Sequence, residues 1–144
     1  MIRLADFNDI PALHDLSYLW DEDGEPIDED VLSNYITDGT VYCAEEGDEI
    51  AGIMILIENG DRSIQLSRLF VHPYYRQCGI GNQFIEQLKT HMDQASLQTA
   101  FVTVSLQNDD ALLLYEQRGF CDTGSRHQGR YGETYCDMAL NVPT

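Results

Sequence analysis

The sequence has few basic residues and no long apolar run, and both absences exclude classes of protein. It holds 8 Lys and Arg against 25 Asp and Glu, a formal net charge of −17. This balance argues against nucleic acid as a partner, because binding through phosphates needs many cations to displace counterions. No apolar run approaches the roughly 20 residues that cross a bilayer. The first residues also lack the basic and apolar segments of a secretory signal. We expect no membrane partner and a cytoplasmic location.

The cysteines form neither a metal-binding nor a disulfide pattern. Cys43, Cys78, Cys121 and Cys136 include no CxxC pair, and no cluster of cysteine and histidine has the spacing of zinc ligands. We expect reduced thiols and no bound metal.

The length of 144 residues, 43% of them hydrophobic, predicts one globular domain over residues 1–144. Its charge is uneven. Residues 1–60 contain 16 acids and a single base, Arg3, whereas residues 61–144 are nearly balanced. One interpretation is solubility. The other is that the acidic part attracts a cationic ligand.

Apolar periodicity and turn residues divide the chain into ten elements. Helical spacing is present over residues 6–20, 31–37, 80–92 and 108–118. Strand patterns are present over residues 40–45, 50–57, 64–71, 100–106, 120–127 and 134–140. The run 50–57 is apolar throughout, which predicts a strand buried on both faces. The order ααβββαβαββ predicts an α/β fold with a mixed sheet.

The most informative segment covers residues 69–81, where a strand leads through a loop with Arg76 into a helix. Gly79 and Gly81 lie just before that helix. Backbone N–H groups at a helix start point outward, and the helix dipole adds partial positive charge. Glycines let a ligand approach the backbone closely. These features predict a pyrophosphate site, with an ordinary glycine turn as the alternative. The loop matches neither the Walker motif nor GxGxxG, since residue 84 is Phe.

A second pattern follows the next strand. Residues 76–81 read Arg-x-x-Gly-x-Gly, and residues 108–120 read Asn-x-x-Ala-x-x-x-Tyr-x-x-x-Gly-Phe. The two patterns resemble motifs A and B of the GNAT superfamily of N-acetyltransferases. The resemblance covers residues 64–121 by motif and the whole chain by element order. It implies a mixed, mostly antiparallel central sheet flanked by helices, in one acetyltransferase domain.

The resemblance also implies an acetyl-CoA site without a metal. Backbone groups of Phe70 and Val71 would bond the pantetheine arm, where the family's strand bulges and splays from its neighbour. Asn108 would bond the pantetheine directly or through water. Tyr115 would protonate the leaving thiolate, its alternative role being a core aromatic. The residues expected around the pyrophosphate are Arg76, Gln77, Cys78, Gly79, Ile80, Gly81 and Asn82.

The implied reaction is direct attack of a free amine on the thioester, which needs a base. Several family members have a Glu near the start of the strand before the loop, but residues 64–68 contain no acid here. Glu58, at the end of the previous strand, is one candidate. His72 and a water relay to the acidic region are the others.

The acceptor wall of this superfamily would include Tyr18, Trp20 and the acidic run 21–30. Carboxylates with aromatic rings suit a cationic amine: a polyamine, an aminoglycoside, a lysine or a peptide N-terminus. Arg126 and Arg130 could instead bind an acidic group, which keeps an amino-acid acceptor open. Dimers are frequent in the superfamily, so a homodimer is among the partners considered. Two further alternatives are a longer acyl-CoA donor and a non-catalytic module that only binds acyl-CoA.

Overall fold

The computed structural model describes residues 1–19 and 26–142, which form one seven-stranded sheet with helices on both faces. The strands are β1 (Ile2–Leu4), β2 (Thr40–Glu46), β3 (Glu49–Glu58), β4 (Ser63–Val71), β5 (Thr99–Ser105), β6 (Cys121–Gln128) and β7 (Thr134–Asn141). The helices are α1 (Ile10–Ser17), α2 (Glu29–Asp38), α3 (Ile80–Gln94) and α4 (Asp109–Gln117), with short 3₁₀ helices η1 (Phe7–Asp9) and η2 (Pro73–Tyr75). Within these residues, no helix is long and apolar enough to cross a membrane.

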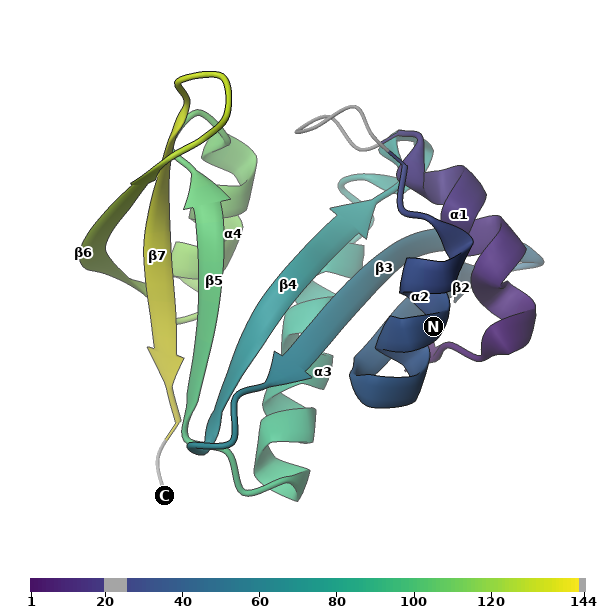
Figure 1. Ribbon diagram of the computed structural model, residues 1–144, viewed down its shortest axis with the longest axis horizontal. Helices are drawn as coiled ribbons and strands as arrows, with labels where there is room; N and C mark the ends of the chain where they lie inside the picture. Colours follow the sequence, from purple (N-terminus) through teal and green to yellow (C-terminus); the bar gives the residue numbers. More distant parts are fainter. Residues whose placement is uncertain (20–25, 143–144) are drawn as a thin grey trace.

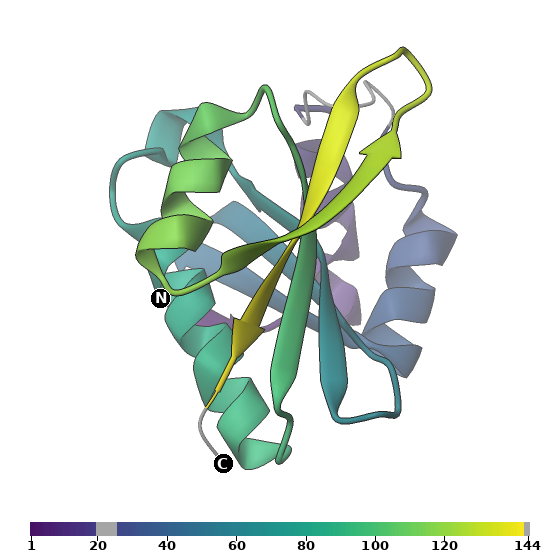
Figure 2. The same cartoon turned by 90° about the vertical axis from the view of Figure 1, so that its left-hand side faces the viewer.

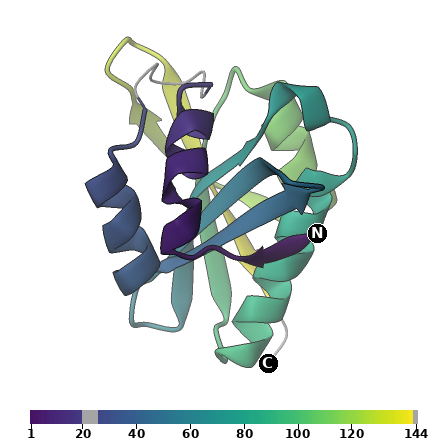
Figure 3. The ribbon, with the colours of Figure 1, turned by 90° about the vertical axis from the view of Figure 1, so that its right-hand side faces the viewer.

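The sheet is mixed, as the element order predicted, and mostly antiparallel, as the resemblance implied. Its strand order is β1-β2-β3-β4-β5-β7-β6, and among the strands of the described residues only the β4–β5 pair is parallel. Figure 3 shows the sheet between two helical layers, α1 and α2 on one side and α3 and α4 on the other. The predicted order of helices and strands is confirmed, except that the prediction did not include β1.

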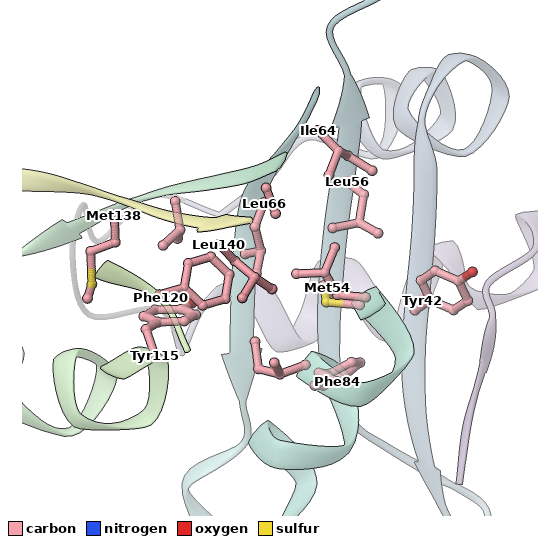
Figure 4. Packing of buried hydrophobic residues seen from close by; sticks show 14 of the residues in the cluster. Tyr42, Met54, Leu56, Ile64, Leu66, Phe84, Tyr115, Phe120, Met138 and Leu140 are labelled. Atoms are coloured by element: carbon pink, nitrogen blue, oxygen red, sulfur yellow. The ribbon is translucent and has the colours of Figure 1, made fainter. Parts of the chain in front are cut away.

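Strand β3 is buried on both faces, as its apolar run predicted. Ile53 and Ile55 pack in a cluster with α1 and α2, whereas Met54 and Leu56 belong to the larger cluster under α3 and α4. Figure 4 shows part of the larger cluster, in which Phe84 lies near Met54, and Tyr115 near Phe120, Met138 and Leu140. The sheet is thus fixed from both sides.

The first helical segment differs from the prediction of one helix over 6–20. It begins with η1, which Asp6 and Asp9 cap reciprocally, and continues as α1 with Pro11 in its first turn. Proline suits that position because its missing N–H has no intrahelical acceptor there.

Strands β4 and β5 pair along only part of their length. The pairing runs from Ser63–Thr99 to Leu66–Val102 and then stops, although β4 continues to Val71. Opposite β3 the register shifts between Leu66 and Arg68, so that Ser67 forms a bulge. The two strands diverge toward the top of Figure 1. The strand therefore bulges at Ser67 and diverges from β5 after Leu66, ahead of Phe70 and Val71.

Strands β6 and β7 form a hairpin at one edge of the sheet, which faces the viewer in Figure 2. Every residue of β6 is exposed. Helix α4 lies behind β5 and β7 in Figure 1, while no described helix covers the front of these two strands. That front face is open beside the divergence of β4 and β5.

Candidate active site

The loop between β4 and α3 presents backbone amides at a helix start. His72 closes the strand and accepts a hydrogen bond from the Tyr74 amide on Nδ1 at 3.0 Å. The backbone then turns through Gln77, with φ of 66°, and Gly79, with φ of 83°. Because α3 begins at Ile80, the amides of its first turn have no acceptor inside the helix. They are available to an anion.

The two glycines of the loop have different structural tasks. Gly79 is in the left-handed region, and a Cβ there would meet no atom within 4 Å. Gly81 lies inside α3, where a Cβ would come within 3.2 Å of Leu114 Cδ2. Gly79 therefore permits the turn and leaves the backbone open to close approach by a ligand. Gly81 serves the close packing of α3 against α4.

Two arginines lie at this loop, one of which sequence reasoning missed. Arg76 donates from Nε to the carbonyl of Val71 at 3.1 Å and lies over the Phe70 ring, 5.4 Å from its centroid. Arg118, at the end of α4, donates from Nε to Oδ1 of Asn82 at 2.9 Å. No motif marks Arg118, since only the packing of α4 on α3 brings it to the loop.

None of the cysteines is bonded to another, and they differ in exposure. Cys78 in the loop and Cys121 are exposed, whereas Cys43 and Cys136 are buried. Burial raises the pKa of Cys43 to about 11, which keeps that thiol protonated. Among the residues that the structure describes, no three His, Cys, Asp or Glu side chains gather as metal ligands.

Helix α4 carries the two motif residues expected near the thioester. Asn108 caps the helix, accepting from the Ala111 amide on Oδ1 at 3.2 Å. Its side-chain nitrogen remains available to donate elsewhere. Tyr115 is buried at 5% exposure, with its ring edge-on to Phe120 at 5.2 Å. The tyrosine is thus part of the core under α4, with its ring held in place by packing.

Glu58 lies far from the glycine loop. It pairs with Ile64 near the start of β4, whereas Val71 is the last residue of that strand. Ile64 and Val71 are seven residue steps apart, which is about 23 Å at 3.3 Å per residue. Its carboxylate lies 3.6 Å from Nε2 of His91 on α3. The structure brings this candidate base to a histidine, away from the loop.

The expected acceptor wall lies partly in the described residues. Trp20 and residues 21–25 lie outside them. Tyr18 is exposed, with its ring edge-on to His14. Asp28 caps α2 by accepting from the Asp30 amide, and Glu29 and Asp30 occupy its first turn. These three acids stabilise a helix start, where negative charge is favourable.

Arg126, one of the two arginines considered for an acidic acceptor, pairs with a carboxylate of its own strand. Its guanidinium binds both carboxylate oxygens of Asp122 at 2.9 and 2.8 Å. That bond, with one from the Gly124 amide, lowers the pKa of Asp122 to about 2.

A hydrogen-bonded cluster on the open face was also missed. His127 Nε2 lies 2.6 Å from Oδ2 of Asp137, and Thr103 donates to Oδ1 of Asp137 at 2.7 Å. Burial opposes ionisation of Asp137, but the bonds from His127 and Thr103 outweigh it and lower the pKa of this carboxyl. The residues come from β6, β7 and β5, so no spacing in the sequence could have revealed the contact.

A mixed sheet with one diverging parallel pair, a glycine loop at a helix start and a buried tyrosine on the next helix define the GNAT class of acetyltransferase fold. The chain belongs to the family described as the acetyltransferase (GNAT) domain, whose model matches residues 22–142.

Relatives in sequence have only general names. The uncharacterized N-acetyltransferase YvbK of Bacillus subtilis is 25% identical over 91 residues, 63% of this chain and 59% of the relative. The uncharacterized N-acetyltransferase Rv2669 of Mycobacterium tuberculosis is 29% identical over 98 residues, 66% of this chain and 62% of the relative. The matches thus span about three fifths of each relative.

Solved structures show the same fold over the whole chain. The ribosomal-protein-S18-alanine N-acetyltransferase of Escherichia coli has a TM-score of 0.85 at 21% identity, covering 100% of this chain and 94% of its own. A GNAT family acetyltransferase from Elizabethkingia anophelis with acetyl-CoA bound scores 0.76 at 17% identity, covering 99% and 97%. A chimera of the Vibrio cholerae spermidine N-acetyltransferase SpeG with hSSAT scores 0.81 at 17% identity, covering 98% and 95%. At these identities the likeness establishes the fold alone.

Proposed function

We propose that this protein transfers an acetyl group from acetyl-CoA directly to a primary amine. The observation that carries the proposal is the divergence of β4 from β5 after the pair Leu66–Val102. The amides at the start of α3 lie on one side of this divergence and Tyr115 of α4 lies on the other. A thioester that enters this divergence would have its pyrophosphate at the helix start and its sulfur near α4.

The residues present suit the parts of CoA. The first turn of α3 offers the amides of residues 80–82, and Gly79 leaves the backbone open to close approach, which fits a pyrophosphate without many cations. Beyond Leu66, the edge of β4 no longer pairs with β5, so its backbone groups can bond the amides of a pantetheine arm. Asn108, at the start of α4, has a side-chain amide for the same arm.

The chemistry follows from this arrangement. The amine nitrogen attacks the carbonyl carbon, a C–N bond forms, and the C–S bond breaks. A backbone amide on the unpaired part of β4 can polarise the carbonyl oxygen. Tyr115 can give its phenol proton to the leaving sulfur. No covalent enzyme intermediate is needed.

We further propose a cationic acceptor. The support is the net charge of −17, with 16 of the 25 acids in the first 60 residues, where α1 and α2 lie. Neighbours in fold are named for a protein-alanine amine and for spermidine. The Asp122–Arg126 pair weighs against Arg126 as a receptor for an acidic acceptor.

The test is a thiol-release assay with acetyl-CoA and a panel of spermidine, an aminoglycoside, single amino acids and lysine-containing peptides. Tyr115→Phe is compared with wild type, and Tyr74→Phe, at an exposed tyrosine, is the control. We expect turnover on a cationic amine that falls in Tyr115→Phe at unchanged CoA affinity by calorimetry. CoA binding without turnover on any amine would favour a non-catalytic binding module. Absence of CoA binding would contradict both.

A further inference from the structure

Acetyl transfer to an amine needs a group that removes a proton from the acceptor. An alkylammonium has a pKa of about 10, so at neutral pH almost none of it can attack a thioester. Residues 64–68 of β4 contain no carboxylate, and Glu58 lies beside His91 at the other end of the strands. His72, another candidate, already accepts the Tyr74 amide on Nδ1. These observations favour a base from a different element.

His127, Asp137 and Thr103 form one chain of hydrogen bonds across three strands. The ionised carboxylate of Asp137 accepts on both oxygens, so the His127 ring donates from Nε2. In the neutral ring this leaves the lone pair on Nδ1. A carboxylate that orients an imidazole also stabilises the imidazolium formed when the ring takes a proton.

The cluster is accessible to solvent. The side chain of His127 is 54% exposed and that of Asp137 is 24% exposed. Tyr135 of β7 lies opposite His127 in the hairpin. On β6 itself, Asp122 and Arg126 lie opposite the buried Met138 and Cys136, on the α4 side. The groups around the ring are thus the Asp137 carboxylate, which it contacts, and Tyr135, whose hydroxyl donates to Glu133 at 3.3 Å.

The position of the cluster relates it to the transfer site. Val102 is the last residue of β5 that pairs with β4, and Thr103 follows it directly. Since Val102 and Val104 point into the core under α3 and α4, Thr103 points to the open face. Asp137 lies opposite Thr103 and shares that face. Tyr115 belongs to the core on the other side of the sheet.

We infer that His127 is the general base of the transfer and that Asp137 is its positioning residue. The inference rests on the proposed function. His127 lies about two strand spacings, ~10 Å, from β5, which borders the divergence, and a short chain of ordered waters on the open face would carry the proton over that distance. Acid and base then approach the thioester from opposite faces of the sheet.

The protons balance in this scheme. The ammonium gives one proton through these waters to Nδ1 of His127, and the imidazolium later releases it to solvent. The neutral amine attacks, the C–N bond forms, and the C–S bond breaks. Tyr115 protonates the thiolate, and the second proton lost by the nitrogen restores the phenol. The products are an amide, free CoA and one proton.

The test compares two acceptors of similar size whose amines differ in basicity. Ethylamine is protonated at pH 7, whereas 2,2,2-trifluoroethylamine is already neutral and needs no base. We expect His127→Gln, which keeps a donor for Asp137, to lower kcat/KM for ethylamine about 100-fold and for trifluoroethylamine less than about threefold. Asp137→Asn should show the same selectivity with a smaller loss. Asp122→Asn, on the other face of the hairpin, is the matched control and should show no selectivity.

CoA affinity by calorimetry accompanies each variant and separates folding from chemistry. An equal loss on both amines would assign His127 a structural role and overturn the inference. A selective loss of kcat/KM for ethylamine in Glu58→Gln, with none in His127→Gln, would also overturn the inference. Either result leaves the proposed function standing, because wild type still acetylates amines. A wild type that binds CoA and acetylates neither these two amines nor any amine of the larger panel would overturn both proposals.

Discussion

The Nε of Arg118 donates to Oδ1 of Asn82 at 2.9 Å, which ties the end of α4 to the first turn of α3. The same guanidinium lies 3.4 Å from Glu86, one turn further along α3. A positive charge is thus held beside the amides where the proposed pyrophosphate binds. In a chain with 25 acids and 8 bases, a cation placed there has a marked local effect.

Arg118→Gln is predicted to weaken CoA binding. The variant removes the charge beside the α3 start while a side-chain amide can still reach Asn82. We expect a loss of about threefold to tenfold in affinity at low salt, smaller at high salt because exposed charges are screened. Calorimetric titration with CoA at two salt concentrations measures it. Lys89→Gln, further along α3, is the control, and an equal loss there would indicate a general charge effect.

The two loop glycines predict different responses to alanine. Gly79 has a φ of 83° in open space, so Gly79→Ala should cost about 1 kcal/mol of unfolding free energy through backbone strain. In Gly81→Ala the gain in helix propensity, about 1 kcal/mol, opposes a contact of 3.2 Å with Leu114. We expect the second variant to change stability by less than the first. Urea denaturation of both variants decides this, and the opposite ranking would contradict it.

Local patterns predicted most of the fold, and contacts between distant residues explain what they missed. The strand 50–57 and the helix 80–92 agree with β3 and α3 to within two residues, because burial imposes its period on the sequence. Strand β1 has only three residues, and its pairing with β2 and the bonds of Arg3 hold it in place.

The same distinction applies to the site. The amides of residues 77–82 could be predicted because a glycine loop and the helix after it are adjacent in sequence. The contact of His127 with Asp137 depends on the register of β6 against β7, which an irregularity between Asp122 and Arg126 sets. A side chain moves to the other face when the register shifts by one residue, so the sequence could not show which face His127 occupies.

Arg3 and Asp9 predict a pH dependence of stability. Arg3 donates to both oxygens of Asp9 at 2.9 Å, and these bonds, against the opposing effect of burial, lower the pKa of Asp9. A lowered carboxyl pKa contributes stability that is present above pH ~4 and is lost as the pH falls through the folded-state value. Asp9→Asn should therefore cost about 1 kcal/mol at pH 7 and less at pH 3. Urea denaturation at both pH values checks this, with the exposed Asp15→Asn as the control. A constant difference between wild type and Asp9→Asn would contradict it.

Loss of the hydrogen bond between Tyr42 and His91, under α3, is predicted to lower the free energy of unfolding. The Tyr42 hydroxyl lies 3.1 Å from Nδ1 of His91, while Nε2 is buried and has no hydrogen-bond partner among the described residues. Tyr42→Phe would leave both ring nitrogens without a bond, so we expect a loss of about 1–2 kcal/mol in unfolding free energy. Tyr74→Phe, at an exposed position, should change it by less than about 0.5 kcal/mol.

A double-mutant cycle separates the bond from the packing around it. Because replacing both partners by apolar groups removes the unpaired polar atoms, Tyr42→Phe with His91→Leu should cost less than the sum of the single changes. Urea midpoints at constant slope measure the coupling. Additive costs would show that the hydroxyl and the imidazole contribute independently and would contradict the prediction.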